Sequence, residues 1–422
     1  MIKVKLHYAI LLETGAAFLI LIYPSLMFAV KGGMNGVFLL LLLLSLGVWA
    51  YRPGEMQPIG WNRKMTFYLL AMASMPIAIF MSQSYHHHYS GHPYDAASRY
   101  LLAVPIFMML RRVRFGAVAT VQYGFPLAAI AGCLMLKPIA DGRYGIATLD
   151  LIHFGDFELV LGVLSVLSIN WTGRDALLLR SLKIIGFLAG IYASIISGSR
   201  GGWISLPVFL AIFIYFRFGK IHLKALIAAS LMLIVAVFLA YTFSREIHHR
   251  FEDVVNDLSA FQHGNPDTST GVRLQLFTAA AEIFVQNPVF GVGPEGFAHE
   301  MGPMQKTGKI TAMAAELGKG EVHNELLSKA AGMGVIGLIA MLSIYLVPSG
   351  IFYLSMRSDT ARVRQAGMLG LVFVSGFMIF GLTAETLNLT MATAFYSLTV
   401  AVLLAACLNV HRAEAFQKDP HV

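Results

Sequence analysis

Long apolar segments recur along almost the whole chain, and they restrict the fold more than any other feature of the sequence. A helix that crosses a lipid bilayer needs roughly 20 consecutive apolar residues. The chain is 57% hydrophobic and only 13% charged, whereas soluble domains carry about 25% charged residues. We therefore predict an all-α, polytopic membrane protein with about 12 transmembrane helices. The candidate segments are residues 8–29, 33–50, 65–84, 99–110, 115–136, 149–170, 177–197, 201–216, 223–243, 332–355, 363–383 and 388–410.

One polar segment interrupts this pattern. Residues 244–330 are rich in charged and polar side chains and are long enough to form a small helical subdomain. The predicted organisation is therefore transmembrane helices 1–9 in residues 1–243, a large loop in 244–330, and helices 10–12 in 331–422, all in one functional unit. The first apolar run lacks a convincing small-residue cleavage site, so we interpret it as a retained span. Both cysteines, Cys133 and Cys407, lie in apolar runs and offer neither a disulfide framework nor zinc-ligand spacing.

The distribution of basic residues predicts the orientation. A net charge of +8 would also suit nucleic-acid binding, but lysine and arginine characteristically mark the cytoplasmic loops of membrane proteins. With the N-terminus inside, 19 of the 31 basic residues fall in cytoplasmic segments, 5 in short outer loops, and the others in the large loop. This bias favours an even number of spans, two cytoplasmic termini and a periplasmic position for residues 244–330. It gives no reason to expect a nucleic-acid partner.

The large loop has a helical pattern of its own. The segment "TGVRLQLFTAAAEIFVQNPVFGVGPEGF" predicts a helix capped by Thr270, with Arg273 in its first turn, that ends at Asn287-Pro288. A second helix is predicted to begin near Glu321 and to run into the tenth span. The apolar stripe of the first helix is predicted to consist of Leu274, Phe277, Ala281 and Phe284.

Three residues on the predicted outer face are the strongest candidates for chemistry: Arg200, Arg273 and His323. Arg200 stands among small residues in "SGSRGG", and small residues allow tight turns and a close approach of a ligand. Two permanent cations beside one titratable imidazole suit a substrate that carries phosphate, because the planar guanidinium matches phosphate oxygens and stays charged. A position of Arg273 at a helix N-terminus would add backbone N–H groups to the same preference for anions.

Each candidate also has a purely structural interpretation. Arg200 would suit a lipid-headgroup anchor, Arg273 an exposed helix position and His323 an interfacial histidine. Arg99 and Arg143 also lie on the predicted outer face. They would either extend a cationic cleft or anchor the edge of the membrane.

Other motifs point less clearly to chemistry. The tract "YHHHYSGH" would suit metal binding, but a polar histidine-rich loop explains it equally simply. Asp156 and Glu158 have the spacing of an acidic metal motif, yet residues i and i+2 of a helix face different ways. Glu13 and Glu385 lie in or beside spans, where a carboxylate is costly, and the sequence identifies no partner for either. There is no Walker A loop and no G-x-S-x-G motif, so nothing indicates nucleotide use.

Three segments together resemble a known family. "SGSRGG", "GVRLQLFTAAAEIFVQNPVFGVGPEGF" and "HNELLSKAAGMGVIGL" occur in the order seen in the O-antigen ligase and polymerase superfamily of bacterial membrane glycosyltransferases. Members of that family have an outer-face arginine after a span, an arginine in the large periplasmic loop and a histidine entering the next span. The motifs cover about residues 190–340, and the predicted topology extends the resemblance to the whole chain. A single dominant outer loop is typical of the ligases, whereas the polymerases tend to have a second one.

The resemblance implies a function in lipopolysaccharide biosynthesis. The expected enzyme is a glycosyltransferase of the bacterial inner membrane, with its active site facing the periplasm. It would transfer a polysaccharide from undecaprenyl pyrophosphate to a sugar of the lipid A-core, with no metal, nucleotide or other cofactor. The resemblance assigns pyrophosphate binding to Arg200 and Arg273 and the role of general base to His323. Stabilisation of the leaving pyrophosphate by two guanidinium groups explains physically why a metal would be dispensable.

Two alternatives remain at this point. An O-antigen polymerase would use the same donor but a second lipid-linked glycan as the acceptor. A transporter of lipid-linked glycans would perform no chemistry, and would be expected to place charges or broken helices near the bilayer midplane. Here the unusual charges cluster at the predicted outer face instead.

The basic-residue asymmetry predicts that a cysteine introduced at Asn265 reacts with a membrane-impermeant thiol reagent in intact spheroplasts. Labelling should match that of lysed cells, because residues 244–330 are predicted to face the periplasm. Labelling that appears only after lysis would contradict the predicted orientation.

Overall fold

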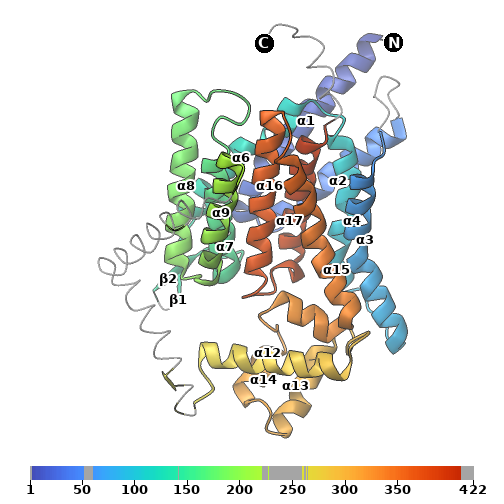
Figure 1. Ribbon diagram of the computed structural model, residues 1–422, viewed down its shortest axis with the longest axis vertical. Coiled ribbons are helices and arrows are strands. Elements are labelled where there is room, and N and C mark those ends of the chain that lie inside the picture. Colours follow the sequence, from blue (N-terminus) through green and yellow to red (C-terminus); the bar gives the residue numbers. More distant parts are fainter. Residues whose placement is uncertain are drawn as a thin grey trace.

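The computed structural model describes residues 2–51, 60–140, 142–220 and 265–409, together with residues 227, 259, 260 and 263. It is almost entirely helical (Figure 1), which confirms the predicted all-α class. The helices are α1 (Ile2–Ala29), α2 (Gly33–Tyr51), α3 (Arg63–His86), α4 (Tyr94–Leu110), α5 (Phe115–Val118), α6 (Val121–Leu134), α7 (Leu151–Leu167), α8 (Leu177–Ser197), α9 (Ser205–Phe218), α12 (Ser269–Gln286), α13 (Gly296–Lys306), α14 (Ala312–Gly318), α15 (Glu325–Ser355), α16 (Ala361–Phe380) and α17 (Thr390–Cys407). Two short 3₁₀ helices are η1 (Gly201–Ile204) and η2 (Thr386–Asn388), and one antiparallel hairpin is formed by β1 (Lys137–Ala140) and β2 (Arg143–Gly145).

Many of these helices suit a bilayer. Within the described residues, eight helical segments are long and apolar enough to cross a membrane: Leu11–Ala29, Arg63–His86, Phe115–Leu134, Leu177–Ser197, Gly201–Phe218, Glu325–Ser355, Ala361–Phe380 and Thr390–Cys407. Gly33–Trp49 is a shorter apolar helix. The predicted spans 99–110 and 149–170 correspond to α4 and α7, each of 17 residues. The predicted span 223–243 lies outside the described residues, and the count of twelve spans stays a prediction.

The last helix, α17, lies at the centre of the bundle. Every residue from Ala392 to Cys407 is buried, as expected for a helix that is apolar on all sides. Its polar side chains find partners inside the bundle, as buried polar groups must. The Tyr23 and Thr399 hydroxyl groups lie 2.9 Å apart, and the Tyr396 hydroxyl donates to the Ile344 carbonyl at 2.8 Å. These contacts tie α17 to α1 and α15.

The outside of the bundle is apolar as well. Large hydrophobic side chains are exposed on several helices, among them Leu43, Phe67, Leu70, Leu178 and Ile339. A soluble monomer rarely exposes apolar surface on this scale. Because such a surface suits lipid tails, the fold is that of a multi-pass membrane protein.

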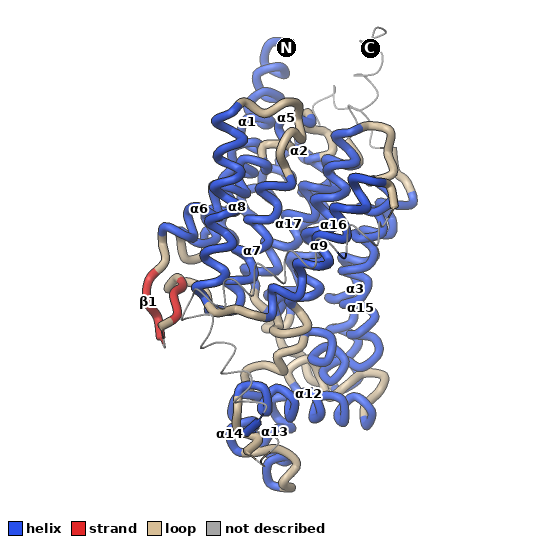
Figure 2. Tube along the Cα trace, turned by 60° about the vertical axis from the view of Figure 1, so that its left-hand side comes forward, coloured by secondary structure: helices blue, strands red, loops and turns tan. Residues whose placement is uncertain are grey.

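The described part of the large loop forms a small helical unit at one end of the bundle. In Figure 1 the start of α1 lies at the top, whereas α12, α13 and α14 lie together at the bottom. Figure 2 shows the same unit below the bundle and the β hairpin beside the lower ends of its helices. A separate hydrophobic cluster holds the unit together, and it includes Val272, Leu276, Ile283, Met301 and Ala314.

Helix α12 differs from its prediction in two respects. Thr268, rather than Thr270, is the N-cap, and its side chain accepts a hydrogen bond from the Gly271 N–H. Arg273 is therefore the fifth helical residue, so it lies beyond the first turn and its unpaired N–H groups.

The predicted apolar stripe of α12 is also wrong. Val272, Leu276, Ala279, Ala280 and Ile283 form the buried face, whereas Leu274 is 42% exposed. The helix is apolar on more than one side, and the available packing partners, α13 to α15, decide which side is buried.

Helix α15 begins later than predicted and is kinked. It starts at Glu325 after the N-cap Asn324, and Gly334 has a non-helical backbone with φ 63°. The glycine-rich turn after α12 docks at this kink. Val292 N–H donates to the Ala331 carbonyl at 3.0 Å, and Val335 N–H donates to the Pro288 carbonyl at 2.8 Å. Because a Cβ at Gly334 would lie 2.3 Å from the Val289 backbone, only glycine permits this approach.

Two charged groups gain partners that the sequence did not identify. Glu13 pairs with Arg114, with 2.5 Å between Glu13 Oε2 and Arg114 Nε. Lys183 is one of the 19 basic residues that the sequence analysis assigned to cytoplasmic segments. It is fully buried and pairs with Asp175 at 2.9 Å. A buried charge needs such a partner, so this lysine also has a packing role.

Candidate functional site

Residues 381–389, which connect α16 to α17, form the platform on which the candidate site is built. The loop before α15 is hydrogen-bonded to it. Glu325 N–H donates to the Gly381 carbonyl at 2.6 Å, and the Asn324 side chain donates to the Leu382 carbonyl at 3.3 Å. The platform therefore fixes the start of α15 and, with it, the position of His323.

Glu385 is the central residue of this platform. Its carboxylate is 4% exposed and accepts hydrogen bonds from the Val322 N–H at 2.5 Å and the Ser328 hydroxyl at 2.7 Å. It also accepts one from the Asn388 side-chain amide. Burial raises the pKa of Glu385, and the nearby Lys329 charge offsets part of that rise. The partners that the sequence could not identify for Glu385 thus belong to the loop that carries His323.

His323 itself adopts an unusual backbone conformation. Its φ of 60° is left-handed, which is uncommon for a residue other than glycine and persists only where the surroundings enforce it. Its side chain is 16% exposed, and Nδ1 lies 2.6 Å from Glu321 Oε1. The prediction of a helix from Glu321 onward is therefore wrong at this point, because His323 lies in a constrained turn before α15.

Glu321 holds the imidazole in one orientation. Its second carboxylate oxygen accepts a hydrogen bond from the Glu385 N–H at 3.3 Å. Burial alone would raise the pKa of Glu321, but interactions with His323 and the Glu385 N–H bring it below its usual value. The carboxylate therefore stays ionised and occupies Nδ1 of His323, which leaves Nε2 as the ring nitrogen for a substrate.

Arg200 lies in a second segment that packs on the platform. The preceding residue, Ser199, donates a hydrogen bond to the buried Asp156 on α7 at 2.8 Å. A Cβ at Gly201 would lie 2.4 Å from the Thr383 hydroxyl oxygen, so the small residues of "SGSRGG" are required by close packing. Arg200 is half-buried in this corner.

The two secondary cations have different surroundings. Arg143 on β2 lies against the same corner, since a Cβ at Gly198 would be 3.4 Å from its Nε. Arg99 on α4 instead lies over the Phe38 ring of α2, 5.7 Å from the ring centroid. The structure therefore brings Arg143, but not Arg99, together with the Arg200 segment.

Arg273 approaches from the helical unit below the bundle. It is half-buried on α12. Its neighbour Val272 belongs to the same buried cluster as Val322, the residue before His323. Helix α12 thus packs beside the His323 loop and carries Arg273 to the same end of the molecule as the other candidates.

A cavity of about 990 Å³ opens between the hairpin, the start of α7 and the platform. Its charged and polar lining includes Arg143, His153, Glu321 and Glu385. Its apolar lining comprises Ile139, Ile146, Leu149, Leu151, Ile152 and Leu389. The cavity therefore presents charged groups beside an apolar wall.

His153 is a site residue that the sequence analysis missed. Its Nδ1 lies 2.6 Å from Asp150 Oδ2, and its side chain is 7% exposed. Asp150 is held in turn as the N-cap of α7, where it accepts from the Ile152 and His153 N–H groups. Nε2 of His153 has no hydrogen-bond partner among the described residues. The Asp-x-x-His spacing at a helix start was the available signal, since a capping carboxylate is placed to contact a side chain three residues later.

The remaining motifs have structural explanations. Asp156 contacts Ser199, whereas Glu158 lies against Gly132 of α6, so the two carboxylates point apart as expected. In the histidine tract, His86 Nε2 lies 3.0 Å from the Gly291 carbonyl, and His92 pairs with Glu295.

The fold and the site together define a class: an all-helical, multi-pass membrane protein with a polar site at one end of its bundle. Residues 185–342 match the family model described as O-antigen ligase, and this segment contains Arg200, Arg273 and His323. An uncharacterized protein of Haemophilus influenzae is 23% identical over 318 residues, which cover 72% of this chain and 76% of that protein.

An O-antigen ligase of Escherichia coli K12 is 21% identical over 197 residues. The match covers 47% of this chain and 46% of the relative, so it spans just under half of each. With the family match, it confirms the resemblance to the O-antigen ligase superfamily.

The platform generates a prediction about Glu385. Glu385→Ala leaves the buried Val322 N–H without an acceptor and should destabilise the protein by about 1–3 kcal/mol. Glu385→Gln keeps an acceptor oxygen and should lose less. Burial raises the pKa of this carboxyl in the folded protein above its ordinary value of 4.5. Wild-type stability should therefore fall as the pH rises from 4.5 through the raised pKa. Melting temperatures in detergent from pH 4 to 7 check this, and an identical pH slope in Glu385→Gln would contradict it.

Proposed function

We propose that this protein is an O-antigen ligase that transfers a polysaccharide from undecaprenyl pyrophosphate to a sugar of the lipid A-core. The observation that carries the proposal is the convergence of the Arg200 segment and the His323 loop on residues 381–389, beside a cavity with charged and apolar walls. The match to the O-antigen ligase family model and the similarity to an O-antigen ligase support it. The protein would act in the bacterial inner membrane, with its site facing the periplasm.

The donor head group would lie in the 990 Å³ cavity. Arg200 and Arg273 would bind the pyrophosphate through their planar guanidinium groups, and Arg143 would add a third cation. His153, which lines the cavity and contacts Asp150 through Nδ1, would donate a further hydrogen bond from Nε2 to a phosphate oxygen. The apolar wall suits the first part of the prenyl chain, whose remainder stays in lipid.

His323 would act as the general base. The acceptor hydroxyl transfers its proton to Nε2 as its oxygen attacks the anomeric carbon. The bond from that carbon to the phosphate oxygen breaks, and its electron pair leaves with the pyrophosphate. The arginines stabilise this developing negative charge, which is the role that a metal ion plays elsewhere. The carboxylates of Glu321 and Glu385 are engaged by His323 and by donors of the platform, so neither is assigned as a nucleophile. With one base and direct displacement, the reaction would invert the anomeric configuration.

A reconstitution with chelator and without nucleotide tests this function. Purified protein in proteoliposomes is mixed with undecaprenyl-pyrophosphate glycan and lipid A-core, and the products are separated by mass. Glycosylated lipid A-core is the expected product. A longer lipid-linked glycan would indicate a polymerase instead, and movement of glycan between leaflets without a new bond would indicate a transporter.

The two phosphate-binding arginines give the first prediction of this proposal. Arg200→Ala or Arg273→Ala should abolish transfer, because each removes a permanent charge from the leaving pyrophosphate. Lysine should restore only part of the activity, since it keeps the charge but loses the fork geometry. Arg99→Ala, which alters a residue packed on Phe38 away from the cavity, is the matched control. Full activity in both alanine variants would refute the assignment.

His323 gives the second prediction. Histidine has an ordinary pKa of about 6.5, which suits a base near neutral pH. Loss of a general base typically costs roughly 10²–10⁴-fold in rate. His323→Ala should lose transfer by about that factor yet retain donor binding, because the arginines remain. Near-normal turnover in this variant, or a product with retained anomeric configuration, would count against the role.

A further inference from the structure

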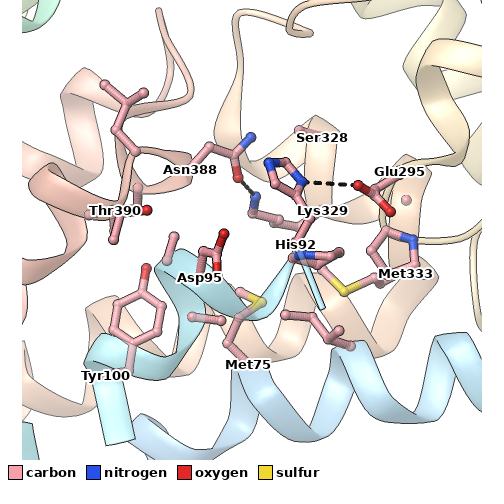
Figure 3. Close-up of a pocket in the computed structure, with 18 of the residues that line it drawn as sticks. Met75, His92, Asp95, Tyr100, Glu295, Ser328, Lys329, Met333, Asn388 and Thr390 are labelled. Carbon is pink, nitrogen blue, oxygen red and sulfur yellow. Dashed lines mark hydrogen bonds and ion pairs between the residues drawn. The ribbon is translucent and has the colours of Figure 1, made fainter. Parts of the chain in front are cut away.

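A second cavity lies beside the first and shares lining residues with it. It has a volume of about 370 Å³, near the lower end of the range for ligand pockets, about 300–1,000 Å³. Its walls come from the start of α4, the turn before α13, the first turns of α15, and the η2 segment. Figure 3 shows polar side chains from these elements pointing toward a common space, above a floor that includes Met75 and Met333.

The two cavities share a wall. Gly320, Asn388 and Leu389 line both of them. Glu321, which holds His323, faces the larger cavity, whereas Ser328 and Lys329, at the start of the helix that follows His323, face the smaller one. The loop before α15 therefore contributes to the wall between the two spaces through Gly320.

The polar groups of the smaller cavity are both donors and acceptors. Lys329 donates to the Asn388 side chain, and His92 Nδ1 lies 3.0 Å from Glu295 Oε1, as the dashed lines in Figure 3 show. Asp95 lines the cavity as well, and its carboxylate has no hydrogen-bond partner among the described residues. Sugar hydroxyls both donate and accept, so a mixture of carboxylate, ammonium and amide groups matches them.

The charges of this cavity disfavour phosphate. Asp95 and Glu295 contribute two carboxylates. The ammonium group of Lys329 is already held by Asn388 and lies 3.6 Å from the buried Glu325. No arginine is among the described residues that line this cavity, whereas Arg143 lines the larger one. The smaller cavity therefore lacks the guanidinium group that suits a phosphate, and its mixed polar groups suit an uncharged polyhydroxylated ring.

We infer that the 370 Å³ cavity binds the acceptor sugar, an inference that rests on the proposed function. In-line displacement places the attacking hydroxyl and the leaving phosphate on opposite sides of the anomeric carbon. Two cavities that share a wall beside the loop of the proposed base suit this arrangement. The smaller cavity holds the terminal sugar of the acceptor, and the larger one holds the pyrophosphate of the donor.

Kinetics with both substrates varied test the assignment. Asp95→Ala removes a charged acceptor for sugar hydroxyls and should raise the KM for lipid A-core by about tenfold, which corresponds to about 1.4 kcal/mol. The KM for the donor should not change. Ala96→Trp fills the cavity and should raise the acceptor KM further. Leu101→Trp is the matched control, since Leu101 lies on the same helix but is 41% exposed and does not line the cavity.

A binding measurement separates this inference from the proposed function. Core oligosaccharide released from a lipopolysaccharide without O-antigen is titrated into the full-length protein in nanodiscs, with no donor present. Wild-type protein and Leu101→Trp should bind it, and Ala96→Trp should not. Equal binding by all three would overturn the inference whether or not transfer occurs. A rise in donor KM instead of acceptor KM would also overturn it, because the cavity would then hold the donor glycan.

Discussion

The carboxylate of Glu385 is the interaction on which the geometry of the site depends. Glu385 lies in the connection between α16 and α17. Its carboxylate accepts a hydrogen bond from the Val322 N–H, in the loop before α15, at 2.5 Å. A buried carboxylate is costly unless its oxygens are hydrogen-bonded, and here donors from the loop, from α15 and from η2 supply those bonds. The same contacts that offset the cost of burying the Glu385 carboxylate hold the loop in which His323 has its left-handed backbone. The same hydrogen bonds therefore stabilise the platform and position the proposed base.

Carboxylate and histidine are paired twice at this end of the molecule. Glu321 contacts Nδ1 of His323, and Asp150 contacts Nδ1 of His153. In each pair the backbone fixes the carboxylate, through the Glu385 N–H in one case and the α7 N-terminus in the other. Each imidazole therefore presents Nε2 in a defined orientation. Side chains held in this way need no reorganisation in the proposed reaction.

The sequence predicted the parts of this structure that depend on composition and local pattern. Apolar length was enough to locate most helices, and unusual cations between small residues were enough to select Arg200. The buried side of α12 was not predictable, because two of its faces are apolar and only the packing partners choose between them. The N-cap of α12 was predicted at the wrong residue, because neighbouring Thr and Ser residues all suit that position. The Asp150–His153 pair was not predicted, because its position beside a cavity depends on segments that are distant in the sequence.

The partners of Glu385 were unpredictable for a similar reason. Val322 lies more than sixty residues away and contributes a backbone N–H, which no sequence pattern marks. The left-handed conformation of His323 likewise has no signal in the residue type. The sequence therefore singled out candidate side chains, while the contacts that orient them could be found only in the fold.

The kink at Gly334 has a mechanical consequence. Backbone hydrogen bonds on either side of it join α15 to the turn that follows α12. The unit that carries Arg273 is therefore attached to α15 at the kink, whereas the His323 loop and the Arg200 segment are both attached to residues 381–389. Any motion of this unit about its attachment would move Arg273 and leave the distance between His323 and Arg200 unchanged.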